Sequence, residues 1–366
     1  MSNTQHSRLL SLDVFRGVTI AAMILVNDPG DWGHIYAPLE HSKWNGCTPT
    51  DLIFPFFLFI VGVSIVYAME RKAADPRNHS KMIWGALRRG VLLILISLTI
   101  HIILHPDFAH MRFPGVLQRI GVVFFICAVL YIKASQKVRD WLFVILLVGY
   151  YLLMTFVPVP DTGVASLLPA TNMGAWVDRM VFSTNHLWSE SHTWDPEGLL
   201  GTLPAIATGL FGIRVGSWLK RKDREDSVKV SWMFTYGVLA VILGLIWDLF
   251  FPINKALWTS SFVLYAGGWA TIALAFFYWL IDVQRYKNFT GFFLPFGANA
   301  ITAYVLSDFV PHYINKIRFG SSSIYQILFE PYWSPFNASL ASAIVMTLLI
   351  WVLMWILYLR KIVIKV

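Results

Sequence analysis

A short polar segment near the N-terminus combines residue types that could do acid–base chemistry. Residues 41–51, HSKWNGCTPTD, lie between long apolar runs at 12–26 and 52–69. The segment brings together an imidazole (His41), amide and hydroxyl groups, and a carboxylate (Asp51) at what reads as a membrane–water boundary. Polar groups are expensive to keep there for packing alone, so we expect the chemistry of this chain to lie in this segment.

The elements that must position this segment are membrane-spanning helices. Of the 366 residues, 57% are hydrophobic and only 14% are charged, whereas soluble domains have about 25% charged residues. Apolar stretches of about 20 residues recur along the whole chain, and each can cross a bilayer. We therefore predict an all-α, polytopic membrane protein with one domain over 1–366 and about ten transmembrane helices: 10–27, 50–70, 81–104, 114–132, 139–157, 198–219, 230–250, 260–283, 290–314 and 337–359.

The first and ninth predicted spans have unusual features. The first has no small-residue cleavage site behind it and is followed directly by a second span, so we expect no signal peptide. The ninth is the weakest because Pro295, Asp308, Pro311 and His312 interrupt it.

The distribution of Lys and Arg predicts the orientation. With the N-terminus in the cytoplasm, the loops on that side, together with the two termini, hold eighteen of these residues, including Arg8 and Lys365. The positive-inside rule therefore places both termini in the cytoplasm and the polar segment on the opposite face. The net charge of +8 then reports topology, and we expect no nucleic-acid partner. The opposite face holds six such residues: Lys43, Arg112, Arg179, Lys255, Lys316 and Arg318.

Other loops expected on the same face are rich in Trp beside acidic and amide side chains. Trp residues stack on sugar rings, and carboxylates or amides hold sugar hydroxyls, so these loops suggest a carbohydrate site. The alternative for the Trp residues is an ordinary aromatic belt at the headgroup level. The candidates for binding an acceptor are Trp44, Asp195, Glu197, Asn254 and Lys255.

Several arginines fall inside the predicted spans, where charged groups are usually paired or line a wet cavity. Arg16 follows Asp13 by three residues, which allows an ion pair on one helix face. Arg119 follows Gln118 near the start of its span. These three residues, Arg16, Gln118 and Arg119, are candidates for guiding an anionic cofactor, because guanidinium groups bind phosphates bidentately. We find no Walker, Rossmann or HExxH motif and no metal-spaced Cys/His cluster, and we expect no metal.

Seven segments together resemble the heparan-α-glucosaminide N-acetyltransferase family, within the transmembrane acyltransferase superfamily. They occur in one order along most of the chain: 11–17 (SLDVFRG), 26–27 (VN), 41–46 (HSKWNG), 51–62 (DLIFPFFLFIVG), 114–121 (PGVLQRIG), 195–202 (DPEGLLGT) and 252–258 (PINKALW). The resemblance implies a transferase that takes acetyl-CoA from the cytoplasm and acetylates an amino sugar across the membrane. It also implies that His41 is the catalytic histidine, that Asn27 is the active-site asparagine and that the protein is a homodimer.

We expect the chain to depart from the lysosomal member in lacking a large N-terminal luminal domain and one preceding span. It resembles a compact bacterial relative in the inner membrane, with its active-site loops facing the periplasm. Glucosamine or a short amino-sugar oligomer is then a more natural acceptor than the end of a heparan chain.

Amide formation from a thioester needs a base and stabilisation of an oxyanion. An imidazole, with an unperturbed pKa of about 6.5, suits the base, so His41 is assigned that role. Asn27 can donate its amide N–H to the thioester oxygen, and Asp51 can orient the His41 ring or pair with the acceptor ammonium. His41 acts either as a base in direct transfer, which we favour, or as a nucleophile that carries the acetyl group.

Two other functions fit parts of the sequence. An amino-sugar transporter would also have about ten spans and intramembrane charge, although no repeat between halves is visible. An O-acetyltransferase of surface polysaccharide would use the same site on a hydroxyl group.

Overall fold

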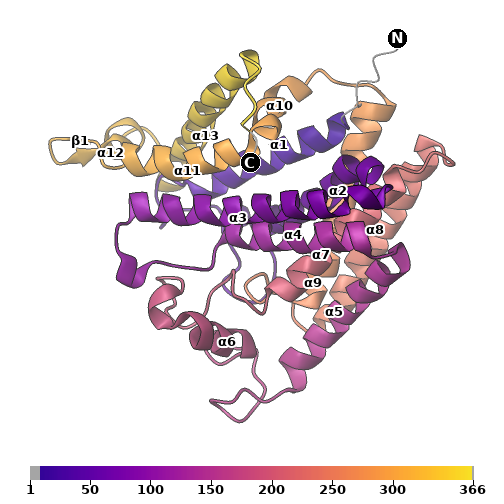
Figure 1. Cartoon of the computed structure of the whole chain (residues 1–366). Coiled ribbons are helices and arrows are strands. Elements are labelled where there is room, and N and C mark those ends of the chain that lie inside the picture. Colours follow the sequence, from indigo (N-terminus) through magenta and orange to yellow (C-terminus); the bar gives the residue numbers. More distant parts are fainter. Residues whose placement is uncertain (1–8, 365–366) are drawn as a thin grey trace. The chain divides into compact units, whose positions relative to one another are not determined.

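The structure, a computed structural model, describes residues 9–364 and is almost entirely helical (Figure 1). Arg8 and Lys365, two of the charges counted for orientation, lie outside the described residues. The prediction of an all-α polytopic fold is confirmed. The helices are α1 (Leu10–Asn27), α2 (Ile53–Ala73), α3 (His79–Leu104), α4 (Val116–Lys133), α5 (Gln136–Phe156), α6 (Met173–Phe182), α7 (Thr202–Leu219), α8 (Asp226–Asp248), α9 (Ser260–Phe277), α10 (Thr290–Ala298), α11 (Ala300–Ile314), α12 (Ile324–Leu328) and α13 (Pro335–Leu359).

Short elements complete the described chain. A two-stranded antiparallel sheet pairs β1 (Arg318–Phe319) with β2 (Ser322–Ser323). The helix α9 continues as a π-helical segment, η6 (Tyr278–Val283). The 3-10 turns are η1 (Ala37–Leu39), η2 (Pro49–Leu52), η3 (Pro76–Asn78), η4 (Phe108–His110) and η5 (Thr184–His186).

Eight helical stretches in residues 9–364 are long and apolar enough to cross a membrane. The pair α10 and α11 would make a ninth span, bent by 85° between Ala298 and Ala300, and this is the interrupted span that the sequence predicted. The helix α7 covers the sixth predicted span, 198–219, but is not among the eight. The number ten therefore stays a prediction. Helices suit this environment because they satisfy every backbone polar group within the segment.

The chain divides into two compact units. The first unit comprises 1–40, 224–234 and 272–365, of which the structure describes 9–40, 224–234 and 272–364. The second comprises 41–223 and 235–271. The helices α8 and α9 contribute residues to both.

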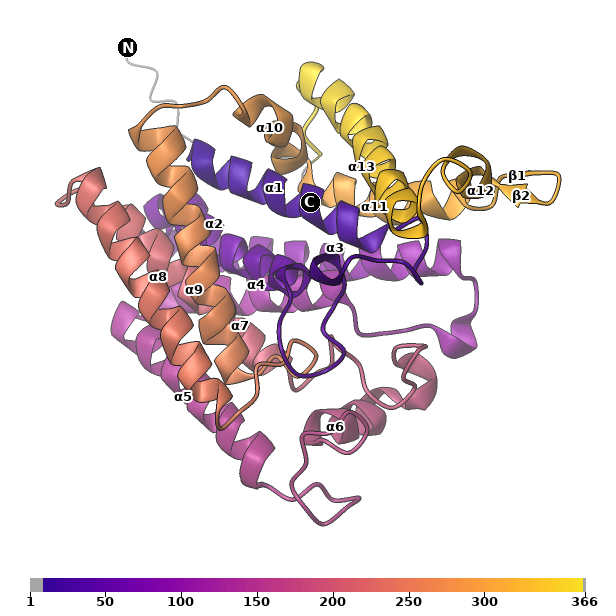
Figure 2. The ribbon, with the colours of Figure 1, turned by 180° about the vertical axis from the view of Figure 1, so that it is seen from behind.

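In the first unit, α10 packs against α1 (Figures 1 and 2). A Cβ atom at Gly17 would lie 2.0 Å from the carbonyl oxygen of Phe293, so only glycine allows this approach. The predicted ion pair on α1 is present, because Arg16 Nη1 lies 2.9 Å from Asp13 Oδ1. The same nitrogen also donates to the carbonyl oxygen of Gly297 at 3.3 Å.

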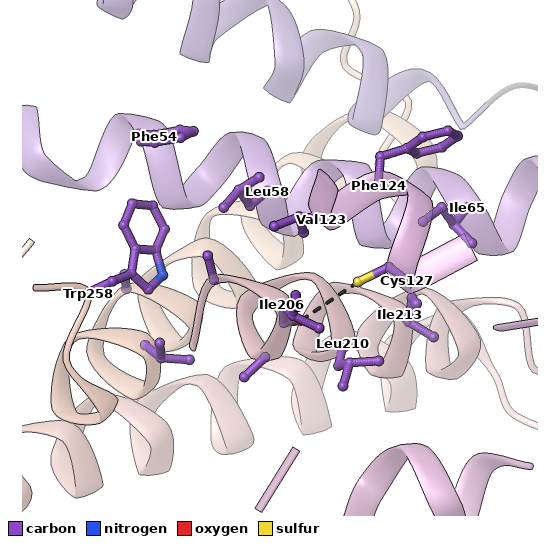
Figure 3. Close-up of a cluster of buried hydrophobic side chains, with 14 of the residues drawn as sticks. Phe54, Leu58, Ile65, Val123, Phe124, Cys127, Ile206, Leu210, Ile213 and Trp258 are labelled. Atoms are coloured by element: carbon purple, nitrogen blue, oxygen red, sulfur yellow. Dashed lines mark hydrogen bonds between the residues drawn. The ribbon is translucent and has the colours of Figure 1, made fainter. Parts of the chain in front are cut away.

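In the second unit, α2 and α7 form the most extensive helix pair, and α3 lies beside α4 (Figure 1). A Cβ atom at Gly62 would lie 2.1 Å from the carbonyl oxygen of Gly209, which explains why small residues line this interface. Aliphatic and aromatic side chains from α2, α4 and α7 fill the core around it (Figure 3). These packed helices support the loops in which the polar segment lies.

Candidate active site

The polar segment is held in shape by Asp51 at the start of η2. Thr48 and Asp51 form a reciprocal capping box, as expected for a Thr followed three residues later by an acidic side chain. Asp51 Oδ2 accepts hydrogen bonds from the backbone N–H of Thr48 at 3.0 Å and of Ser42 at 3.1 Å. The Asp51 side chain is 1% exposed, so its orientation is set by these contacts.

His41 makes a short hydrogen bond to this carboxylate. Its Nδ1 lies 2.7 Å from Asp51 Oδ1. Because an ionised carboxylate only accepts hydrogen bonds, Nδ1 carries a proton, and in the neutral imidazole Nε2 then has the lone pair. The His41 side chain is 48% exposed. The structure thus places His41 and Asp51 in contact, which one of the two roles considered for Asp51 requires, and leaves the His41 ring accessible. The catalytic roles of both residues stay predictions.

Lys255 lies beside the same ring, although it is 214 residues away in the chain. Its Nζ atom is 3.1 Å from His41 Nδ1, 3.3 Å from Nε2 and 3.7 Å from Asp51 Oδ1. Burial lowers the pKa of Lys255, although the charges of Asp51 and Glu197 oppose this shift. We call His41, Asp51 and Lys255 the open cluster.

The loop that carries Lys255 is joined to the polar segment by backbone and amide contacts. The backbone N–H of Gly46 donates to the carbonyl oxygen of Ile253 at 2.7 Å, and Gly46 has a φ of 103°, a conformation that favours glycine. Asn254 Nδ2 donates to Asn45 Oδ1 at 3.2 Å. Asn254 is fully buried, and its Oδ1 accepts a hydrogen bond from the backbone N–H of Leu257. Asn254 was predicted to bind the sugar acceptor, but these contacts hold the loop together.

Asp195 and Glu197, predicted to bind the acceptor, share one cation that sequence reasoning missed. Arg112 Nε donates to Asp195 Oδ2 at 2.8 Å, and Arg112 Nη2 pairs with both Asp195 and Glu197. The side chains of Asp195 and Glu197 are 0% and 8% exposed. We call Arg112, Asp195 and Glu197 the closed cluster.

Charge pairing shifts the titration of this cluster. Burial raises the pKa of Glu197, but the charges of Arg112, Arg119 and Lys255 outweigh it, so the pKa is lowered overall. The pKa of Arg112 is raised, since its hydrogen bonds and the two carboxylates outweigh burial. The sequence alone indicates Arg112 only as a loop charge two residues before Pro114-Gly115.

Arg119 and Gln118 lie at the start of α4. Arg119 is 2% exposed, donates through Nη2 to the carbonyl oxygen of Gly198 at 2.8 Å, and lies over the Trp258 ring at 5.0 Å. Its Nε and Nη1 have no hydrogen-bond partner among residues 9–364. Gln118 Nε2 donates to the carbonyl oxygen of Phe113 at 3.0 Å. The assignment of both residues to a cofactor path stays a prediction.

Trp44 faces Trp194 edge-on, with ring centroids 4.9 Å apart, and its Nε1 donates to the carbonyl oxygen of Leu167 at 3.0 Å. Both rings line a cavity of about 20 Å³ together with Asp178 and Asp195. A cavity of that size has room for about one water molecule, so it does not hold a sugar ring.

Asn27 and Arg16 belong to the first unit. Asn27 is the last residue of α1 and is exposed. Arg16 is held by Asp13, as described above. Their predicted roles, as an oxyanion donor and as part of a cofactor path, stay predictions.

Comparisons with known proteins point to one family. Residues 8–246 match the model of heparan-alpha-glucosaminide N-acetyltransferase, catalytic. The chain is also 31% identical to heparan-alpha-glucosaminide N-acetyltransferase from Homo sapiens over 84% of its length, and equally to that from Mus musculus. It spans about half the length of these two relatives, covering 53% and 54% of them. The chain belongs to the heparan-alpha-glucosaminide N-acetyltransferase catalytic family.

Proposed function

We propose that this chain is a transmembrane N-acetyltransferase that moves the acetyl group of acetyl-CoA to the amine of glucosamine or an amino-sugar oligosaccharide. The observation that carries the proposal is the His41–Asp51 hydrogen bond, in a chain that belongs to this family. The human and mouse relatives are named for transfer of this kind. The charge bias of the loops supports an acceptor on the extracytoplasmic side and a donor from the cytoplasm.

In the proposed reaction, His41 is the general base. The acceptor amine attacks the thioester carbonyl, and His41 Nε2 takes the amine proton while Asp51 holds the ring through Nδ1. Asp51 also stabilises the imidazolium that forms, because it is buried and already fixed by Thr48 and Ser42. The C–S bond then breaks, and the proton leaves with the CoA thiol.

The oxyanion of this reaction needs a hydrogen-bond donor. We propose Asn27 for this role, because a side-chain amide N–H can bind the oxygen that gains charge. One such donor contributes about 2.7–4 kcal/mol to transition-state stabilisation. Direct transfer is favoured over an acetyl-histidine, because an amine beside His41, as Lys255 Nζ is at 3.3 Å from Nε2, lies where a base can take its proton.

The remaining predicted residues divide by their contacts. We propose that Trp44 and Lys255 face the acceptor, while Asp195, Glu197 and Asn254 hold the loops that present them. Arg16, Gln118 and Arg119 remain proposed for the acetyl-CoA path, with the unpaired nitrogens of Arg119 as the supporting observation. A homodimer in a bacterial inner membrane, with the active-site loops facing the periplasm, is part of the proposal.

The test is acetyl transfer by the purified full-length protein in proteoliposomes, with radiolabelled acetyl-CoA and glucosamine. We expect His41→Ala to fold and to bind acetyl-CoA but to lose transfer by about 10²–10⁴-fold, the usual contribution of a general base. The matched control is His110→Ala, since His110 Nδ1 makes a similar contact with Asp107 Oδ2 at 2.9 Å but both side chains are more than 60% exposed. Transfer by His110→Ala should match the unmodified protein.

Three outcomes would contradict the proposal. Near-normal transfer by His41→Ala would remove His41 from the mechanism. Accumulation of unmodified glucosamine without acetyl-CoA would identify a transporter. Acetylation of N-acetylglucosamine, with none of glucosamine, would identify an O-acetyltransferase.

A further inference from the structure

The amine of Lys255 occupies a position that the proposed reaction requires of a substrate amine. It lies 3.3 Å from His41 Nε2, the nitrogen that must accept the amine proton, and 3.7 Å from Asp51 Oδ1. A general base works on a proton within hydrogen-bond reach, and Nζ is at the edge of that reach. The chain therefore carries, beside its own base, a primary amine of the same chemical class as the proposed acceptor.

Burial of Lys255 also makes its neutral form easier to reach than that of an exposed lysine. Its side chain is 18% exposed. Burial lowers the pKa of Lys255, against the charges of Asp51 and Glu197. Only the neutral amine has the lone pair that attacks a carbonyl, so a larger fraction of Lys255 is nucleophilic at neutral pH than for an exposed lysine.

The loop contacts keep this amine in place. Asn254, the preceding residue, is fully buried and bonded to Asn45, and Gly46 is bonded to Ile253. These contacts fix the backbone at Lys255, so its side chain lies next to His41. Such positioning converts a bimolecular encounter into an intramolecular one and raises its rate.

We propose that Lys255 is an acetylation site: when acetyl-CoA is bound and no acceptor amine is present, the Lys255 amine takes the acetyl group. This inference rests on the proposed function, because it needs the same thioester. Nζ attacks the carbonyl carbon and forms the C–N bond, and His41 Nε2 takes one amine proton. The C–S bond breaks, and the thiolate leaves as the CoA thiol with that proton.

The product would change the open cluster. An amide nitrogen carries no charge, so acetylation removes the cation beside Asp51 and adds an acetyl group next to His41. The modified protein should acetylate glucosamine more slowly than the unmodified protein. Incubation with acetyl-CoA and no acceptor would therefore lower the later rate of acetyl transfer by the enzyme.

The test uses full-length protein in proteoliposomes, incubated with acetyl-CoA and without acceptor, then digested and analysed by mass spectrometry. We expect one acetyl group on Lys255 and none on Lys43, which is exposed in the same polar segment and serves as an internal control. Excess glucosamine should suppress the modification, and His41→Ala should prevent it. Lys255→Arg keeps the charge but removes the nucleophile, so no acetyl group should appear at this position.

Two results would overturn this inference alone. One is a preparation that acetylates glucosamine when it is supplied but leaves Lys255 unmodified when the acceptor is withheld. The other is equal acetylation of Lys255 and Lys43, which would show a non-enzymatic reaction of exposed amines. If neither glucosamine nor Lys255 is acetylated, the proposed function is overturned together with the inference. Acetylation of glucosamine and of Lys255 are both measured on the protein without substitutions, so these results do not depend on whether a variant folds.

Discussion

The open and closed clusters are built from similar residue types but differ in what they leave accessible. In the open cluster, Asp51 is buried while the His41 side chain is 48% exposed and keeps an accessible nitrogen. In the closed cluster, Arg112 is 22% exposed and both of its carboxylates are almost fully buried. The two clusters therefore differ in accessibility, and the proposed chemistry is assigned to the one with an exposed imidazole.

The largest expected effect is on turnover, from Asp51→Asn. An Asn side chain can donate its N–H to His41 Nδ1, which would place the ring proton on Nε2 and remove the base. We expect acetyl transfer to fall by about 10²–10⁴-fold, as for loss of a general base. Steady-state transfer to glucosamine measures this, with thermal unfolding in detergent as the check on folding.

The control for Asp51→Asn is Asp107→Asn, in the exposed pair with His110. That variant should keep its transfer rate. A normal transfer rate in Asp51→Asn would contradict the catalytic role proposed for the open cluster, because Asp51 would then matter no more than Asp107 of the exposed pair.

A large loss of stability is expected from Arg112→Met in the closed cluster. It leaves Asp195 and Glu197 buried without their cation, and breaking a buried pair costs about 3–5 kcal/mol of unfolding free energy. Thermal unfolding should show this loss, while transfer per folded molecule stays within a few fold. Replacing both carboxylates in the same chain by Asn and Gln should recover part of the stability.

Arg112→Met also tests whether the closed cluster takes part in the reaction. If it abolishes transfer without lowering the unfolding temperature, the closed cluster contacts substrate. The different roles proposed for the open and closed clusters would then be wrong.

Asp178 beside the closed cluster should show what a buried carboxylate does without such a cation. It is 2% exposed, and burial raises its pKa to about 6. The folded state then binds more protons than the unfolded state between about pH 4 and pH 6, so stability falls as the pH rises through that range. Asp178→Asn does not titrate and its oxygen can still accept from the Leu199 backbone, so we expect it to be more stable at pH 7 by about 3 kcal/mol.

The measurement for Asp178 is the unfolding temperature of both proteins from pH 4 to pH 8. The gain of Asp178→Asn should shrink as the pH falls and vanish near pH 4. A variant that is less stable at every pH would show that the charged form of Asp178 is needed.

The smallest expected effect is on the thiol of Cys47, which adjoins the open cluster. Burial raises the pKa of Cys47 to about 12, and the charge of Asp51 adds to the shift. Because the thiolate is the reactive form, alkylation of Cys47 at pH 7 should be slow and should quicken with rising pH. Mass spectrometry of iodoacetamide-treated protein measures the rate, and Lys43→Cys supplies an exposed thiol in the same segment. Equal rates at pH 7 would contradict the partial burial of the Cys47 thiol.

Much of the fold could be predicted because it is local and periodic. The predicted span 10–27 coincides with α1, and the Asp13–Arg16 pair follows from the spacing of residues on one helix face. The interruption of the ninth span was visible in its prolines, whereas the 85° bend between α10 and α11 was not. A sequence signals that a helix breaks, but packing sets the angle.

The candidate site divides in the same way. His41 and Asp51 are ten residues apart, and a capping box that sequence can recognise positions the carboxylate. Lys255 and Arg112 were not assigned to their partners, because 214 residues separate Lys255 from His41 and 83 separate Arg112 from Asp195. Nothing in local spacing reports contacts over that distance.

By itself, the sequence determined that this chain crosses a membrane in helices and that residues 41–51 hold its most unusual polar groups, because hydropathy and capping depend on neighbouring residues. Only the tertiary structure decided which carboxylates have a cation of their own and which amine lies against His41. The physical reason is that these pairings depend on loops joined through Gly46, Ile253 and Asn254, whose contacts form only once the helices have packed.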